Sequence, residues 1–275
     1  MRKIVQNILL FLLIINVSYA LAGIFFYPIK SIDALAIWLF KGKAIYLDNG
    51  LLSQILKLPK YFYSSPDYPL LLPFLFSIIY KLAGGIREIY VLLLYPFFYS
   101  AILILVYKTL KGKTTTTVAL FFTYLYSMLS PLLAQAGRGL AGNADIVLVF
   151  FSWLIIYLVF TRPSKNFIFY ISVIAAVSSQ IKTEGLFLAT PLLFLPNSRC
   201  RKISFLSLAV FPFIFWIIMT KIIIVTPFTR FFIPSFAQLL PRIFIIFSGL
   251  IKEMLNVKNW YIFWPIFSLC LFRVI

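Results

Sequence analysis

Long apolar runs separated by short basic clusters dominate the chain, and several of the runs reach about 15 residues or more. Because the hydrocarbon core of a bilayer is about 30 Å thick, a helix needs ~20 mainly apolar residues to cross it. A transmembrane barrel would show short segments of alternating polarity instead. The pattern predicts an all-α, polytopic membrane helix bundle, with spans near 4–27, 89–107, 118–131, 146–160, 167–181, 186–195, 203–224 and 260–272.

The basic clusters predict how these spans are threaded. Lys and Arg favour cytoplasmic loops, so all the clusters lie in the cytoplasm if two spans separate each successive pair. The run at 4–27 is long enough to be an uncleaved first span, although a signal peptide cleaved near 20–22 is an alternative. The clusters are Arg2/Lys3, Lys108/Lys111/Lys113, Arg162/Lys165, Arg199/Arg201/Lys202 and Arg273.

This threading leaves residues 28–88 as one long outer segment between the first span and the next. The apolar run at 70–83 inside it is short, contains Pro73 and carries Lys81. We therefore expect it to lie on the outer surface rather than to cross the bilayer. The chain is predicted to be a single membrane-embedded module, 1–275, with a first span at 4–27, an outer catalytic loop at 28–88 and further spans over 89–275.

Composition narrows the chemistry. The chain is 63% hydrophobic with a net charge of +18, and its basic residues are scattered between apolar runs. Membrane topology and anionic headgroups explain this charge better than nucleic acid does. Cys200 and Cys270 match no metal or redox spacing and are expected to be packing residues. Because the chain has no histidine, a general base must be a carboxylate, or less readily a Lys or Tyr with a shifted pKa.

Only seven residues are acidic, and several lie where an apolar chain has least reason to carry charge. An ionisable group at the membrane is costly unless it is paired or faces a polar cavity, so it is a candidate functional residue. The predicted threading gathers six such groups from three separate segments at the outer face. They are Asp33, Asp67, Arg138, Asp145, Lys182 and Glu184.

Each of these residues also has an ordinary structural interpretation. Asp33 and Asp145 stand at predicted helix starts, where the helix dipole favours an acid. Asp67 lies in a proline-rich turn, where an Asp side chain often hydrogen-bonds to the backbone. Lys182 and Glu184 flank a break between two spans and can form an exposed ion pair of little energetic value.

Two stretches resemble the first outer loop of the GT-C superfamily of membrane glycosyltransferases: Asp33-Ala-Leu-Ala-Ile-Trp38-Leu-Phe-Lys41-Gly-Lys43-Ala and Ser65-Pro-Asp67-Tyr68-Pro69-Leu-Leu-Leu-Pro73. The nearest similarity is to protein O-mannosyltransferases and aminoarabinose lipid A transferases. The family's order continues with a Pro, a basic outer loop, an Asp that opens the next span, and a Lys at a broken helix. The matching positions are Pro131, Arg138, Asp145 and Lys182-Thr-Glu-Gly185, within about residues 30–190.

The resemblance implies an inverting transfer of a sugar from a polyprenyl-phosphate lipid to an acceptor protein, lipid or glycan. Asp33 matches the family's catalytic carboxylate and would be the base. The donor phosphate would bind Arg138 and Lys182, with Lys41 and Lys43 in reserve. Asp67, Tyr68, Asp145 and Glu184 would orient the acceptor and sugar or hold the cations. The enzyme would lie in the plasma membrane with its site facing outward.

Asp33 and Asp145 each stand alone, whereas some GT-C enzymes bind a divalent metal through D-x-D acids. We therefore expect no metal or cofactor, and a monophosphate donor. Family members usually carry further spans or an outer domain, so this sequence is expected to be a fragment or a minimal catalytic module. An inactive GT-C-like scaffold is one alternative. A transporter or flippase of lipid-linked or small anionic substrates is another, although transporter sites lie near the midplane between repeats.

Overall fold

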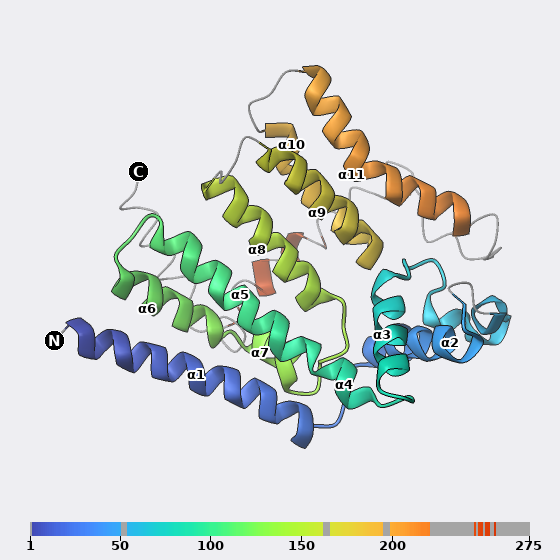
Figure 1. The fold of residues 1–275 in the computed structure, drawn as a ribbon, viewed down its shortest axis with the longest axis horizontal. Coiled ribbons are helices and arrows are strands. Elements are labelled where there is room, and N and C mark those ends of the chain that lie inside the picture. The colour runs from blue at the N-terminus through green and yellow to red at the C-terminus, as the bar shows by residue number, and fades with distance from the viewer. Residues whose placement is uncertain are drawn as a thin grey trace.

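The computed structural model describes residues 2–50, 54–161, 166–194 and 199–220, with a few residues between 245 and 256. These residues form helices and connecting loops, with no strand in the described parts (Figure 1). The main helices are α1 (Arg2–Phe26), α2 (Phe40–Asp48), α3 (Leu71–Leu82), α4 (Glu88–Leu92), α5 (Leu94–Lys111), α6 (Thr116–Ser127), α7 (Ser130–Gly137), α8 (Asp145–Thr161), α9 (Phe167–Ile181), α10 (Pro191–Phe194) and α11 (Arg199–Met219). Shorter π and 3₁₀ turns are η1 (Ala34–Leu39), η2 (Gln54–Lys57), η3 (Pro59–Ser64) and η4 (Thr183–Ala189).

Within the described residues, two helical stretches are long and apolar enough to cross a membrane. They are α1, with 25 residues, and the α4–α5 stretch Glu88–Lys111, with 24. A third candidate is the pair α6 and α7, which is bent by 68° at the break between them. Pro131 stands in the first turn of α7, where its fixed φ suits a helix start but prevents α6 from continuing. The predicted run at 118–131 is therefore two helices.

The other predicted spans correspond to shorter apolar helices. The run at 167–181 has the bounds of α9, and 146–160 lies within α8. In the run predicted at 186–195, residues 186–189 belong to the 3₁₀ segment η4 and residues 191–194 form α10, because Pro191 begins a new helix there. At 12 residues, α3 is about 18 Å long, short of the hydrocarbon thickness. The predicted span at 260–272 and the residue Cys270 lie outside the described residues.

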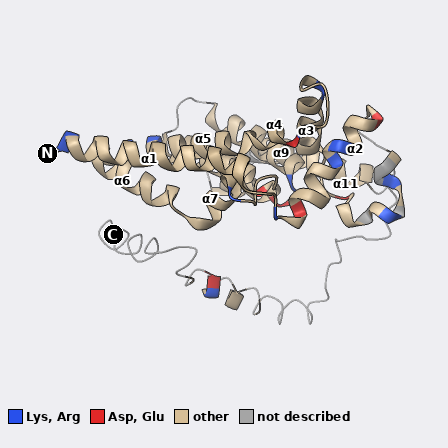
Figure 2. Cartoon of the chain, turned by 90° about the horizontal axis from the view of Figure 1, so that it is seen from below, with Lys and Arg blue, Asp and Glu red and all other residues tan. Residues whose placement is uncertain are grey.

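The helices are arranged with two distinct ends. We call the end where α1 begins, at Arg2, and α5 finishes, at Lys111, the basic end; α6, α9 and α11 also begin there (Figure 1). We call the opposite end the loop end, since α2 and α3 lie there with the last turns of α1, α9 and α11. Long stretches of α1 and α6 between the two ends carry no charged residue (Figure 2).

Close helix packing depends on small residues where α1 meets α7. A Cβ atom added at Gly137 would lie 2.0 Å from the carbonyl oxygen of Ala20, and one at Gly23 would lie 2.5 Å from that of Gly137. Small residues let helix backbones approach in this way in membrane bundles. The contact ties the bent α6–α7 pair to the first helix, and the loop that follows α7 carries Arg138.

We predict that Gly137→Ala lowers the free energy of unfolding by about 1–3 kcal/mol, because the added methyl group overpacks the α1–α7 contact. Gly85→Ala is the matched control, since a Cβ at Gly85 meets no atom within 4 Å. Thermal unfolding in detergent measures both variants. Equal stability of the two variants would contradict the close approach.

Candidate functional site

The start of the first outer segment is hydrogen-bonded to the loop between α7 and α8. The Lys30 amide donates to the carbonyl of Gly139 at 2.7 Å, and the Ser31 hydroxyl donates to the Asn143 side-chain oxygen at 2.8 Å. The Ser31 oxygen also accepts from the amide of Ala34 at 3.2 Å, so Ser31 caps the helix that begins here. The predicted outer segments at 28–34 and 138–145 therefore lie side by side.

Gly142 lets these two segments approach closely. Its φ is +107°, a value that favours glycine, and a Cβ added there would lie 2.7 Å from the Cβ of Ala34. Asp145 follows three residues later and opens α8, so no more than about 11 Å of backbone separates it from Gly142. The structure thus brings Asp33, which precedes Ala34, near the beginning of α8.

The Asp33 side chain is exposed at this junction. Ser31, and not Asp33, supplies the cap of the helix, and Asp33 makes no side-chain capping hydrogen bond. Among the described residues no hydrogen bond or ion pair engages its carboxylate. A carboxylate held on an ordered backbone with its oxygens open to solvent can accept a proton from a bound molecule.

Lys182 links the end of α9 to the start of α8 through an ion pair. It ends α9 in an extended conformation, and its ammonium lies 2.8 Å from an Asp145 oxygen and 3.6 Å from a Glu184 oxygen. The Lys182 side chain is 21% exposed, whereas Asp145 and Glu184 are about half exposed. Gly185 allows the chain to fold back on α9, since a Cβ there would lie 2.1 Å from the carbonyl oxygen of Ser178.

The surroundings keep the Lys182 ammonium charged. Burial alone lowers the pKa of Lys182, but the hydrogen bond and charge of Asp145, with contributions from Glu184 and Tyr68, raise it above the ordinary value. Tyr68 contributes the smallest of these electrostatic effects on the pKa of Lys182. Asp145, Lys182, Glu184 and Tyr68 form what we call the Lys182 cluster.

Lys41 hydrogen-bonds to the turn that carries Tyr68. Its ammonium is fully buried and donates to the carbonyl oxygens of Ser65, at 2.6 Å, and Tyr68, at 3.1 Å. The Tyr68 ring stacks on the buried Trp38, with ring centroids 5.5 Å apart and planes inclined by 18°. This burial favours a positioning role for Lys41 over contact with a donor phosphate.

An apolar cavity of about 450 Å³ is lined by residues that lie close in sequence to Tyr68 and Lys182. Leu70, two residues beyond Tyr68, lines one side, and Gln180, two residues before Lys182, lines another. Trp216 of α11 lines it as well, and its indole N–H donates to the carbonyl of Asp67 at 2.8 Å. The turn at 67–70 therefore contributes to the wall of the cavity, which is further lined by Leu71, Phe74, Ala176, Val177 and Pro212.

The two remaining predicted cations lie elsewhere. Arg138 is exposed at the end of α7, with its guanidinium carbon 5.8 Å from the centre of the Tyr19 ring. The Tyr19 hydroxyl in turn lies 3.2 Å from that of Tyr27, at the loop end of α1. Lys43 forms an ion pair with Glu88. Neither cation forms an ion pair with Asp145 or Glu184 in the part of the chain that the structure describes.

Several residues at the site had no signal in the sequence. Trp38 and Trp216 lie within apolar runs, where an aromatic side chain usually means packing or lipid contact. The hydroxyls of Tyr80 and Tyr95 are buried and have no hydrogen-bond partner among the residues that the structure describes. Among the described residues, no three His, Cys, Asp or Glu side chains are grouped as a metal site would require.

Comparison of the chain with known protein families, curated proteins and solved structures finds no match. The case for a function therefore depends on the residues and their geometry.

We predict that Asp145→Asn lowers stability at neutral pH by about 1 kcal/mol, because the part-buried Lys182 loses its nearest counter-charge. The pair stabilises the fold fully below the ordinary lysine pKa of ~10.4, and this contribution is lost as pH rises through the raised pKa of Lys182. The stability difference between wild type and variant should therefore shrink above about pH 10.

Thermal unfolding measured from neutral to alkaline pH checks this expectation. Glu184→Gln is the matched control, since that carboxylate lies farther from the ammonium, and its effect should be smaller. A difference between wild type and Asp145→Asn that stays constant with pH would contradict the assignment of the ion pair.

Proposed function

We propose that this protein is a membrane glycosyltransferase that moves a sugar from a polyprenyl-phosphate lipid to an acceptor at the loop end of the bundle. One observation carries the proposal. The part-buried Lys182 pairs with Asp145 at the start of α8, and the loop that leads into α8 is hydrogen-bonded to the segment that carries the exposed carboxylate of Asp33. An apolar cavity is lined by Gln180, two residues before Lys182. A lipid-linked sugar phosphate needs these features together: an apolar place for the tail, a cation for the phosphate and a base for the acceptor.

The Lys182 cluster supports the assignment of the donor phosphate. Charge develops on the phosphate as it leaves, and a cation fixed in advance stabilises that charge. Lys182 is only 21% exposed, and water exclusion strengthens its field. Asp145 and Glu184 hold the ammonium and can orient hydroxyl groups, while the Tyr68 hydroxyl can donate to or accept from the sugar.

Asp33 supplies the base in this proposal. The acceptor hydroxyl or amine attacks the anomeric carbon and gives a proton to the Asp33 carboxylate. The bond between the anomeric carbon and the phosphate oxygen breaks, and its electron pair leaves with the phosphate. The products are the glycosylated acceptor, with an inverted anomeric centre, and polyprenyl phosphate. This displacement requires a carboxylate base and no covalent intermediate.

Arg138 and Asp67 have secondary roles in the proposal. Arg138 is exposed at the same end of the bundle and would attract the phosphate or the acceptor from solvent. Asp67 is part-buried and belongs to the turn that joins Tyr68 to the cavity. The charged residues of the proposed site lie at the loop end of the helices. This placement favours a transferase over a transporter, whose site would lie near the bilayer midplane. We assign the loop end to the outer face of the plasma membrane.

Two substitutions should separate catalysis from binding. Asp33→Asn should lower transfer by about 10²-fold or more, the usual contribution of a general base, while binding of polyprenyl phosphate is unchanged. Lys182→Gln should weaken that binding by roughly tenfold, because a charge-assisted contact is lost. Polyprenyl phosphate is the probe, since it is the product common to all such donors.

Asp48→Asn is the matched control, because Asp48 also belongs to the outer segment but stands at the end of α2. Binding is measured by native mass spectrometry in detergent and transfer by release of polyprenyl phosphate from a sugar-charged lipid. Full turnover by Asp33→Asn would place the base elsewhere. Undiminished lipid binding by Lys182→Gln would remove the phosphate from this cluster.

A further inference from the structure

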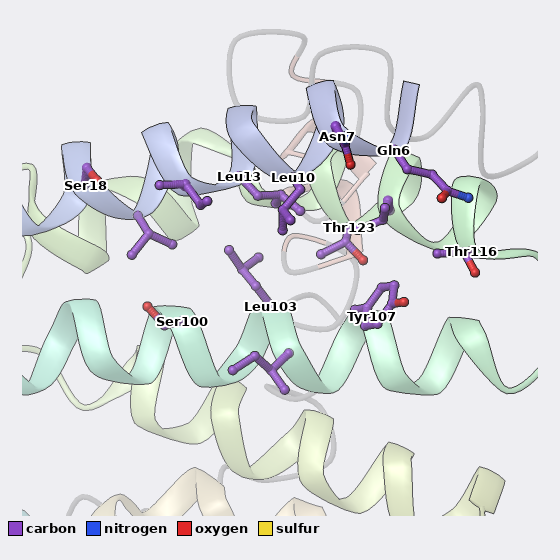
Figure 3. Close-up of a pocket in the computed structure, with 14 residues that line it drawn as sticks. Gln6, Asn7, Leu10, Leu13, Ser18, Ser100, Leu103, Tyr107, Thr116 and Thr123 are labelled. Carbon is purple, nitrogen blue, oxygen red and sulfur yellow. The ribbon is translucent and has the colours of Figure 1, made fainter. Parts of the chain in front are cut away.

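A second apolar hollow lies far from the Lys182 cluster, between α1, α5 and α6. It has a volume of about 590 Å³, and its walls include Leu10, Leu13, Ile14 and Leu103 (Figure 3). Ser18 and Ser100 lie toward one end of this groove, whereas Gln6, Tyr107 and Thr116 lie toward the other. Because α1 begins at Arg2 and α5 finishes at Lys111, the end with Gln6 is at the basic end of the bundle.

The length of the groove corresponds to one leaflet of a bilayer. Along α1 its lining runs from Gln6 to Ser18, which is about 18 Å at 1.5 Å per residue. Half of a hydrocarbon core about 30 Å thick is ~15 Å. An acyl chain lying in this groove would therefore extend from a headgroup at the basic end to about the middle of the membrane.

The mouth of the groove carries hydrogen-bond donors. The Gln6 amide donates to the Thr117 hydroxyl at 2.9 Å, and the Lys111 ammonium donates to the Thr116 hydroxyl. Thr116 lines the groove, so this contact holds the Lys111 charge at its mouth. The side chains of Asn7 and Tyr107 also line it and make no hydrogen bond to another described residue. Their polar atoms are available to ester or phosphate oxygens.

The charge at this end has a single sign. Arg2, Lys3, Lys108 and Lys111 are all exposed there, and α1, α5 and α6 contain no acidic residue. Basic residues beside a membrane surface attract anionic lipids, and basic pockets between membrane helices bind their headgroups. The charge therefore complements an anionic headgroup placed over the polar mouth of the groove.

We propose that this groove binds one acyl chain of an anionic phospholipid, with the phosphate held at Lys108 and Lys111. The lipid comes from the leaflet at the basic end, the one opposite the proposed donor site. The inference depends on α1 and the α4–α5 stretch crossing the membrane, and not on the transfer reaction. Such a lipid would fill the space between the first helix and α5 and stabilise their packing.

The test uses the full chain in nanodiscs that contain equal amounts of phosphatidylglycerol and phosphatidylethanolamine. Native mass spectrometry then counts the lipids retained after gentle release. Ile14→Trp fills the groove, and Ile15→Trp is its control, because Ile15 is exposed on the same helix and does not line the groove. Wild type and Ile15→Trp should each retain one phosphatidylglycerol molecule per protein. The fraction of Ile14→Trp protein that carries this lipid should be about tenfold lower. A Lys108→Gln/Lys111→Gln variant should lose the preference for phosphatidylglycerol.

Three results would overturn the proposal. The first is equal retention by Ile14→Trp and Ile15→Trp, with thermal unfolding showing that both are folded. The second is retention of phosphatidylethanolamine by wild type as strongly as phosphatidylglycerol. The third is occupation of the groove by the predicted apolar run at 260–272. A photoreactive residue at position 14 that cross-links to that run, and not to lipid, would assign the groove to this segment of the chain.

Discussion

The ion pair between Lys182 and Asp145 fixes how the loop end of the bundle is assembled. In a chain this apolar, an ammonium that is 21% exposed requires a counter-charge, and the nearest one comes from the start of another helix, 37 positions away in sequence. The contact brings the end of α9 to the beginning of α8. The loop that leads into α8 is hydrogen-bonded to the segment at 28–34 through Lys30 and Ser31, so three segments that are distant in sequence share one junction.

In the proposed function, this junction supplies the charged groups of the site. Lys41 is buried and donates hydrogen bonds to the turn at 65–68, where the Tyr68 ring stacks on Trp38, whereas Lys182 stays partly exposed. Trp216 ties α11 to the same turn and lines the apolar cavity of the proposed site. In the proposed function the tail, the phosphate and the acceptor would bind here, while the proposed lipid would bind separately in the groove at the basic end.

Much of the helical framework could be predicted from the sequence, because a run of apolar residues between basic clusters has few alternatives. The run at 167–181 has the bounds of α9, and α1 matches the first predicted span within two residues at each end. Two prolines indicate helix breaks that the apolar pattern alone did not predict. Pro131 stands in the first turn of α7, and Pro191 begins α10. Side-chain directions could not be predicted in the same way. The burial of Lys41 depends on the carbonyl oxygens of Ser65 and Tyr68, and the position of Arg138 depends on Tyr19. These partners are distant in sequence, so no local pattern indicated the contacts.

The most direct test of the account is native mass spectrometry of the wild-type protein purified gently from its own membranes. We predict a bound species whose mass is that of a polyprenyl phosphate carrying a hexose or a pentose, which would also name the donor. Phospholipids alone on an intact, folded protein would contradict the proposed transferase and leave a transporter or an inactive scaffold as the better explanation of the Lys182 cluster.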